Sequence, residues 1–223
     1  MKLTAEKVSK KYNRKTGGAG YFYAVGETNF ALEENALTAV FGRSGSGKTT
    51  LLHMLGGLLA PDSGRVLADG RDIYALSDKA LSAFRNRYIG VISQGSTPIA
   101  SLTVLENVLL PSLMAGERAE AYALELLETV GIAALRDAMP GELSGGELRR
   151  MAIARALINK PSIVLADEPT GDLDDENTAM VLSLLRDTAA GGAAVLLVTH
   201  ESEAANYADI VLKMDGGKLT NTL

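Results

Sequence analysis

The sequence has no cysteine, and its only histidines are His53 and His200. Without cysteine the chain cannot form disulfides, bind a metal through thiolates or use a thiol nucleophile. Two histidines are also too few for a histidine-rich metal site. These absences exclude thiol catalysis and argue against a metal centre built on sulfur or imidazole ligands.

Long apolar runs are missing as well. Spanning a membrane takes about 18 or more consecutive apolar residues, whereas the strongest candidate, AVLLV at 194–198, has the length of a buried strand. The N-terminal segment MKLTAEKVSKKY contains no apolar signal region. A net charge of −5 argues against a nucleic-acid surface, which needs clustered Lys and Arg. We expect a cytoplasmic protein with no nucleic-acid partner and no direct membrane insertion, so that any membrane contact comes through a partner.

What the chain does contain is a set of short apolar stretches that alternate with helical segments. The predicted strands lie at 36–42, 88–93, 162–168 and 193–200, the predicted helices at 48–58 and about 175–189, and the predicted hairpins at 64–73 and near the C-terminus. The first hairpin turns at Asp69-Gly70, a favoured two-residue turn. Continuous apolar strands that alternate with helices predict an α/β fold whose mostly parallel sheet is covered on both faces.

The segment from about Thr103 to Lys160 is different, because it shows helical patterns with little strand signal. This block interrupts the alternation of strands and helices. We interpret it as an α-helical subdomain inserted into the α/β core of a single domain. The expected boundaries are 94–159 for the helical subdomain and 1–93 and 160–223 for the core.

The stretch GRSGSGKTT fits the phosphate-binding motif G-x-x-x-x-G-K-[ST], and it stands between a predicted strand and a predicted helix. Glycines let the backbone wrap closely around a phosphate, and the N–H groups at the helix start donate to it. Lys48 would reach the β- and γ-phosphates, and the Thr49 hydroxyl would bind Mg²⁺. The complete motif favours a nucleotide site over an incidental glycine-rich turn. The expected binding residues are Gly42, Arg43, Ser44, Gly45, Ser46, Gly47, Lys48, Thr49 and Thr50.

Two carboxylates stand at the carboxyl end of the predicted strand in the stretch IVLADEPT. Open α/β sheets bind ligands at that edge. We expect Asp167 to complete the Mg²⁺ shell. Glu168, on the other side of the strand, is expected to take a proton from the attacking water or to orient it. Alone, the pair would be interpreted as solvated acids; beside a phosphate loop, it favours hydrolysis.

His200 and Gln94 also follow predicted strands, so both are candidates for the same sheet edge. His200 is expected to contact the γ-phosphate, with an ordinary surface histidine as the alternative. Gln94 is expected to reach Mg²⁺ or the attacking water, although a glutamine at a strand end is unremarkable by itself. We interpret His53, which lies within the first predicted helix, as structural.

The segment LSGGE at 143–147 has the features of a second anion-facing helix start. Ser144 and Glu147 fit a capping box, in which side chains satisfy the first free N–H groups of a helix. Capping does not account for Gly145 and Gly146, because each glycine lowers helix stability by about 0.5–1 kcal/mol relative to alanine. Close approach of the backbone to a ligand would offset that loss.

GRSGSGKTT, Gln94, LSGGE, LADEPT, GDLD at 171–174 and His200 occur in the order found in ATP-binding cassette ATPases, and the resemblance covers essentially the whole chain. It implies a RecA-like P-loop core with an antiparallel β portion near the N-terminus and an inserted helical subdomain. In this family two cassettes pack head to tail, and the signature helix of each covers the ATP held by the other. The resemblance therefore implies that Ser144, Gly145 and Gly146 contact the partner's ATP and that Asp174 lies along the dimer interface.

The family also has an aromatic residue that stacks on adenine shortly before the phosphate loop. Tyr12 fits that position, and stacking of a base on an aromatic side chain contributes about 1–3 kcal/mol. The glycine-rich segment that follows also contains Tyr21, Phe22 and Tyr23, which remain alternatives.

The resemblance implies a Mg²⁺-dependent ATPase subunit that forms a homodimer on ATP binding and drives a separately encoded transmembrane permease. Such a subunit is cytoplasmic and peripheral on the inner face of the cell membrane. The stretches LLHMLGGLLAPDSG, SLTVLENVLLP and LADEPTGDLD are most similar to the branch of macrolide export and lipoprotein release. The alternative is a non-transport cassette that regulates cell-envelope remodelling or division. A DNA-repair ATPase of the same superfamily is disfavoured, because the segment between Lys48 and Ser144 is short and carries no sustained heptads.

Overall fold

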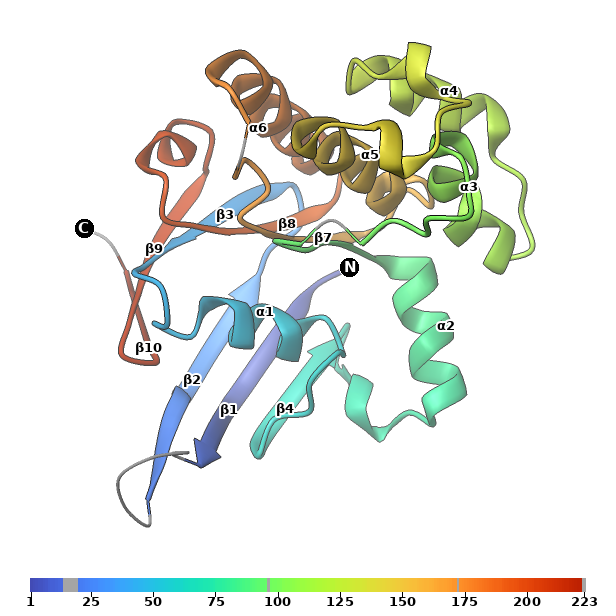
Figure 1. The fold of residues 1–223 in the computed structure, drawn as a ribbon. Coiled ribbons are helices and arrows are strands. Elements are labelled where there is room, and N and C mark those ends of the chain that lie inside the picture. The colour runs from blue at the N-terminus through green and yellow to red at the C-terminus, as the bar shows by residue number, and fades with distance from the viewer. Residues whose placement is uncertain (14–19, 96, 172, 222–223) are drawn as a thin grey trace.

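The computed structural model describes residues 1–13, 20–95, 97–171 and 173–221. Its larger sheet has the strand order β10-β9-β3-β8-β7-β6. The strands from β9 to β6 run parallel, and the edge strand β10 pairs antiparallel with β9 (Figure 1). The strands are β3 (Ala36–Phe41), β6 (Ile89–Ile92), β7 (Ile163–Asp167), β8 (Ala194–Thr199), β9 (Ile210–Asp215) and β10 (Lys218–Asn221).

The central strands are apolar along their length because both of their faces are buried. In β8, Val195 and Leu197 belong to the hydrophobic cluster on one face, whereas Leu196 and Val198 belong to the cluster on the other. Successive side chains of a strand point to opposite faces. A run without polar interruptions is therefore what a sheet covered on both sides requires.

Helices cover one face of this sheet (Figure 1). Their buried side chains share one hydrophobic cluster with β3, β7 and β8. The helices are α3 (Val104–Met114), α4 (Glu120–Thr129), α5 (Gly145–Leu157) and α6 (Asp175–Ala190). The first three lie in the stretch predicted to be helical, and the longest of these has 13 residues. Helices of this length do not form the long coiled coils of the DNA-repair alternative.

The opposite face carries helix α1 (Lys48–Leu55) and a smaller antiparallel sheet in the order β2-β1-β4-β5 (Figure 1). The strands of this sheet are β1 (Leu3–Asn13), β2 (Tyr21–Leu32), β4 (Ser63–Ala68) and β5 (Arg71–Asp72). Leu51, Leu52 and Leu55 of α1 are buried in a cluster that contains side chains of both sheets. This packing fixes the start of α1 next to the end of β3.

The predicted α/β fold, with its mostly parallel sheet, antiparallel β portion and helical segment, is confirmed. The hairpin turn at Asp69-Gly70 is present, with positive φ values of 46° and 80°. The first helix is shorter than predicted: it ends at Leu55, because Gly56 and Gly57 follow and Gly57 adopts a φ of 67°. No helix in the described ranges is both long enough and apolar enough to span a membrane.

Helix α2 (Asp78–Tyr88) is not among the predicted elements. None of its residues is fully buried, but Leu81 and Phe84, three residues apart, pack partly buried against the core. Together with Tyr88 they form a short apolar stripe, a signal that the prediction did not use. Ser77, whose side chain accepts a hydrogen bond from the Ala80 N–H, was the available signal for its start.

Candidate functional site

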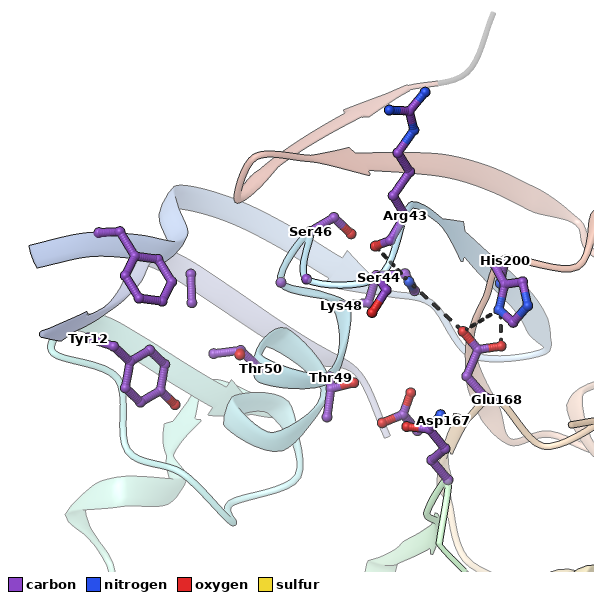
Figure 2. Close-up of a pocket in the computed structure, with 15 residues that line it drawn as sticks. Tyr12, Arg43, Ser44, Ser46, Lys48, Thr49, Thr50, Asp167, Glu168 and His200 are labelled. Carbon is purple, nitrogen blue, oxygen red and sulfur yellow. Dashed lines mark hydrogen bonds and ion pairs between the residues drawn. The ribbon is translucent and has the colours of Figure 1, made fainter. Parts of the chain in front are cut away.

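The carboxyl ends of β3, β7 and β8 meet beside the start of α1, and a cavity of about 750 Å³ opens there (Figure 2). That volume lies within the range of small-molecule sites, about 300–1,000 Å³. The residues predicted from the sequence that line the cavity are Tyr12, Arg43, Ser44, Gly45, Ser46, Gly47, Lys48, Thr49, Thr50, Gln94, Asp167, Glu168 and His200. Segments far apart in the sequence therefore converge on one site.

The loop between β3 and α1 wraps around the Lys48 side chain. The Lys48 ammonium donates to the carbonyl oxygen of Gly42 at 2.7 Å and to that of Arg43 at 3.3 Å. Lys48 is only 6% exposed. Gly47 precedes the helix with a φ of 108°, a conformation that favours glycine. The loop thus brings a buried cation and the free N–H groups of a helix start to one place, which suits a phosphate.

We expect Gly47→Ala to destabilise the protein much more than Gly45→Ala does. A Cβ atom at position 47 would lie 2.0 Å from the Ala24 carbonyl oxygen, so the backbone would have to move. At position 45 the added Cβ meets nothing within 4 Å, and only the left-handed conformation is unfavourable, by about 1–2 kcal/mol. Denaturant unfolding of both variants measures the difference. Equal losses of unfolding free energy would contradict the close approach of the loop to β2.

Asp167 ends β7 and is 3% exposed. Its Oδ1 atom has no hydrogen-bond partner within the described part of the chain. Burial raises the pKa of the Asp167 carboxyl, and a contact with the Thr49 hydroxyl opposes that shift. A buried carboxylate oxygen without a partner, next to a hydroxyl, offers the oxygen ligands that Mg²⁺ prefers.

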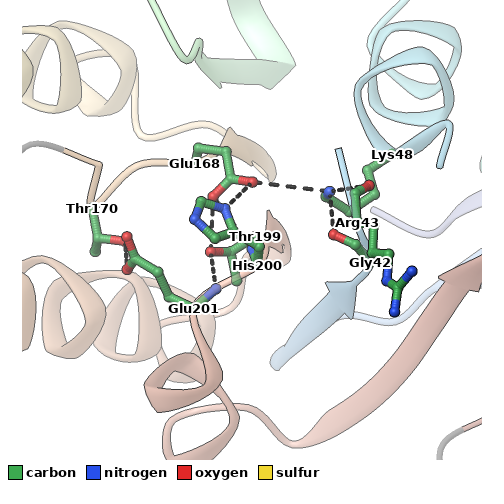
Figure 3. A network of polar contacts seen from close by, with 8 residues as sticks. All are labelled: Gly42, Arg43, Lys48, Glu168, Thr170, Thr199, His200 and Glu201. Atoms are coloured by element: carbon green, nitrogen blue, oxygen red, sulfur yellow. Dashed lines mark hydrogen bonds and ion pairs between the residues drawn. The ribbon is translucent and has the colours of Figure 1, made fainter. Parts of the chain in front are cut away.

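The sequence predicts that Glu168 points to the opposite side of the strand from Asp167, but in the structure both residues line the same cavity. Strand β7 ends at Asp167, and Glu168 turns into the left-handed region with a φ of 47°. Its Oε2 accepts a hydrogen bond from the Thr199 hydroxyl at 3.0 Å, and its Oε1 lies 2.9 Å from His200 Nδ1 (Figure 3). The Lys48 ammonium lies 3.9 Å from the same Oε1. Such a backbone conformation costs about 1–3 kcal/mol and is enriched at functional sites.

His200 follows β8 and directs its ring to the cavity, where 69% of its side chain is exposed. The hydrogen bond with Glu168 raises the pKa of His200. Because folding raises this pKa, the ion pair stabilises the folded protein below the ordinary pKa of histidine. That contribution is lost as the pH rises through the raised value.

Tyr12 and Phe22 form the wall of the cavity on the side of the antiparallel sheet. They are register partners on β1 and β2, and their ring centroids lie 6.1 Å apart. Tyr21 and Tyr23 instead contact each other, with centroids 5.5 Å apart, and neither lines the cavity. Of the four aromatic residues considered for stacking on a base, only Tyr12 and Phe22 therefore line the cavity.

Five predicted residues do not line the cavity: Gly42, Ser144, Gly145, Gly146 and Asp174. Ser144 caps α5 in a capping box with Glu147, as the sequence predicts. Asp174 caps α6, because its side chain accepts a hydrogen bond from the Asn177 N–H at 2.8 Å. Ser144, Gly145 and Asp174 are exposed. The two capped helix starts therefore do not contribute to the wall of this chain's own cavity.

Ala24 and Thr199 were not predicted from the sequence, and Phe22 was predicted only as an alternative to Tyr12. Thr199 bonds Glu168, and the available signal was a hydroxyl at the end of an otherwise apolar strand. Phe22 would follow from the register of β1 with β2. Asp172, within the stretch GDLD, lies outside the described residues.

Comparison with known protein families identifies the family of this chain. The profile of the family described as ABC transporter matches residues 25–171, well over half of the chain. The chain belongs to the ABC transporter family. The resemblance to ATP-binding cassette ATPases that the motifs indicate is thereby confirmed.

Named relatives of this ABC cassette are ATP-binding proteins. The lipoprotein-releasing system ATP-binding protein LolD of Bordetella pertussis is 42% identical over 221 residues, which cover 97% of this chain and 94% of that protein. LolD of Chromohalobacter salexigens is 46% identical over 186 residues, which cover 82% and 78%. The macrolide export ATP-binding/permease protein MacB of Chlorobaculum tepidum is 40% identical over 205 residues, which cover 87% of this chain and 32% of MacB.

Solved structures of another ABC cassette agree with the fold. The dimeric structure of MJ0796, a bacterial ABC transporter cassette, matches with a TM-score of 0.90 and 32% identity over 98% of each chain. A dimeric post-hydrolysis state of MJ0796 bound to ADP and Pi matches equally well.

Proposed function

We propose that this ABC cassette binds ATP in the cavity, hydrolyses it and thereby drives a permease through cycles of dimer closure and opening. One observation carries the proposal: the phosphate loop, Asp167, Glu168 and His200 surround a single cavity of nucleotide size. Each of these groups supports a different part of the reaction.

ATP binding is assigned to the loop before α1 and to the aromatic wall. The N–H groups at the start of α1 would donate to phosphate oxygens. Lys48 would exchange its bonds to the Gly42 and Arg43 carbonyls for bonds to the β- and γ-phosphates. Tyr12, with Phe22 as its alternative, stands at the opposite end of the cavity from His200, where the base would stack (Figure 2).

Mg²⁺ fits the residues at the end of β7. The unpartnered Oδ1 of Asp167, the Thr49 hydroxyl and the Gln94 amide oxygen would hold it. Mg²⁺ is often bound by one or two carboxylates together with substrate phosphates, so a single aspartate is sufficient. When bound, the ion neutralises charge on the phosphates during hydrolysis.

Hydrolysis is assigned to Glu168 with His200 beside it. The Glu168 carboxylate would take a proton from the water that attacks the γ-phosphate. It is suited to this role because Thr199 and His200 hold it in place at the phosphate end of the cavity. The exposed His200 ring would contact the γ-phosphate.

A second copy of the chain would complete each site. The exposed start of α5, with Ser144, Gly145 and Gly146, is a helix N-terminus that suits an anion, yet it does not line this chain's own cavity. We assign it to ATP held by the partner, with Asp174 at the interface between the copies. The dimeric state of the MJ0796 cassette supports this assignment. The proposed helical subdomain 94–159 would carry the α5 start, and 1–93 with 160–223 would form the nucleotide-binding core.

Ser144→Arg tests the shared site. We expect the variant to bind ATP as a monomer with unchanged affinity, but to lose ATP-induced dimerisation and most of its turnover, because the bulky cation blocks the start of α5. Light scattering after size-exclusion chromatography, with and without Mg-ATP, measures the dimer. Ala121→Arg adds the same charge at an exposed position of α4 and should behave like the original protein. An active, monomeric Ser144→Arg protein would rule out the assignment in trans.

The permease is proposed to be a separate transmembrane chain. MacB is named as an ATP-binding/permease protein, and this chain matches only a third of its length. The LolD relatives are named as ATP-binding proteins of a lipoprotein-releasing system. These names favour a transport role over the alternative in envelope remodelling. A cassette of this kind would be cytoplasmic and peripheral on the inner face of the cell membrane.

A further inference from the structure

Two threonine hydroxyls connect the chain after β7 with the chain after β8 (Figure 3). The Thr199 hydroxyl donates to Glu168 Oε2 at 3.0 Å and accepts a hydrogen bond from the Glu201 N–H at 3.0 Å. The Thr170 hydroxyl donates to Glu201 Oε2. Because Thr170 lies two residues after Glu168, these bonds close a ring through Glu168, Thr170, Glu201 and Thr199.

Three of the four ring residues are buried, Glu201 is half-buried, and the hydroxyl groups of the ring have fixed roles. Glu168, Thr170 and Thr199 are 8%, 3% and 1% exposed. A hydroxyl has one hydrogen to donate. The Thr199 hydroxyl must direct it to Glu168, because its other neighbour in the ring is itself an N–H donor. The ring therefore sets the orientation of the Glu168 carboxylate.

The ring also includes Glu168, whose left-handed backbone conformation needs support from its surroundings. The Glu168 N–H donates to the Val198 carbonyl oxygen at 2.9 Å, one residue beyond the ladder between β7 and β8. Glu168 itself is in the left-handed region, and the next side-chain anchor along the chain is the Thr170 bond to Glu201. A left-handed conformation at a residue other than glycine persists only where its surroundings hold it.

We propose that Thr170 and Glu201 are positioning residues, which hold Glu168 in its left-handed conformation and aim its carboxylate. Neither residue lines the cavity, so neither would touch the nucleotide. The inference rests on the proposed role of Glu168 in hydrolysis. It gives a role to Thr170 and Glu201, which do not contact the proposed ATP site.

Opening the ring would affect hydrolysis and ATP binding differently. Glutamate has a long side chain, and a misplacement of about 1 Å in a reacting group lowers rates by as much as about a hundredfold. The phosphate loop belongs to a separate element, and Lys48 remains bonded to the Gly42 and Arg43 carbonyls. We therefore expect kcat to fall while the affinity for ATP stays the same.

The test compares Thr170→Val, which keeps the shape of threonine without the hydroxyl, with Thr170→Ser, which keeps the hydroxyl. Thr38→Val is the matched control, because Thr38 is a buried strand residue whose hydroxyl has no partner among the described residues. For each protein we would measure kcat with Mg-ATP, the Kd for ATP and the Tm. Thr170→Val should lower kcat about tenfold with Kd within about twofold, and Thr170→Ser and Thr38→Val should keep both within about twofold.

Wild-type turnover in Thr170→Val would overturn the proposal, as would an equal loss of kcat and affinity, or a loss in Thr170→Ser as large as in Thr170→Val. If Thr170→Val does not fold, Glu201→Ala removes the acceptor instead, and Glu203→Ala, at an exposed position nearby, is its control. Glu201→Ala should likewise lower kcat about tenfold and leave the Kd for ATP within about twofold. Normal turnover by Glu201→Ala would contradict the proposal. Glu168→Gln is measured in parallel: if it turns over ATP, the proposed function fails, whereas an inactive Glu168→Gln with an active Thr170→Val overturns only the positioning role.

Discussion

Glu168→Gln is expected to bind ATP with nearly unchanged affinity and to lose turnover by about a hundredfold or more. A general base contributes about 10²–10⁴ to the rate, and an amide cannot take the proton from the attacking water. The fold should survive, because glutamine has the same shape and its amide oxygen still accepts from the Thr199 hydroxyl. ATP should then accumulate in a closed dimer.

The first measurement is light scattering after size-exclusion chromatography of Glu168→Gln, with and without Mg-ATP. A change from monomer to dimer that requires ATP would support both shared sites and the role of Glu168. A dimer that forms equally without ATP would contradict ATP-driven closure, and normal turnover by the variant would contradict the assignment of the base. Glu203→Gln removes a nearby exposed carboxylate and should behave like the original protein.

The same variant has a second effect, which NMR titration of the histidine rings detects. Glu168 raises the pKa of His200 through a hydrogen bond and through its charge. Glu168→Gln removes that charge, so the pKa of His200 should fall. In the original protein the Glu168–His200 ion pair stabilises the fold at low pH, and this contribution is lost as the pH rises through the raised pKa of His200. Glu168→Gln should lack the contribution at low pH too, so its stability should change less across this pH range. The chain has two histidines, so the titration follows two ring signals.

Much of the site could be predicted because parallel strands end at the same edge of a sheet. Asp167 and His200 each follow an apolar run of strand length, and Lys48 follows another after the phosphate loop. Once those runs are taken as parallel neighbours, their carboxyl ends must converge. The cavity that these residues share is a consequence of that topology.

Other features depend on tertiary structure that no local pattern encodes. The left-handed turn at Glu168 is set by bonds from β8, a partner about thirty residues away along the chain. Phe22 enters the cavity because the register of β1 with β2 sets it beside Tyr12. Helix α2 is an exception, because Leu81, Phe84 and Tyr88 form a short apolar stripe that is visible in the sequence and was missed. The partner of the α5 start lies outside a single chain altogether.

Lys48→Ala is expected to lower the affinity for ATP by about a hundredfold or more. Truncating one member of a buried, charge-assisted pair costs about 2–5 kcal/mol, and Lys48 is the buried cation of the phosphate loop. Without ATP the variant should fold, because within the described residues the ammonium donates hydrogen bonds only to the Gly42 and Arg43 carbonyls. Glu168, 3.9 Å from the ammonium, keeps its bonds to Thr199 and His200.

A thermal unfolding series with increasing Mg-ATP separates loss of binding from loss of folding. Ligand at a hundred times its Kd adds about 2.7 kcal/mol to stability, so the original protein and the exposed control Lys79→Ala should both show a rising Tm. Lys48→Ala should keep a similar Tm without ATP and show almost no rise with it. A rise equal to that of the original protein would mean that Lys48 does not face the phosphates. The loop would then be a glycine-rich turn with an incidental lysine. Nothing would then hold the γ-phosphate of ATP near Glu168, and the role of Glu168 in hydrolysis would lose its support.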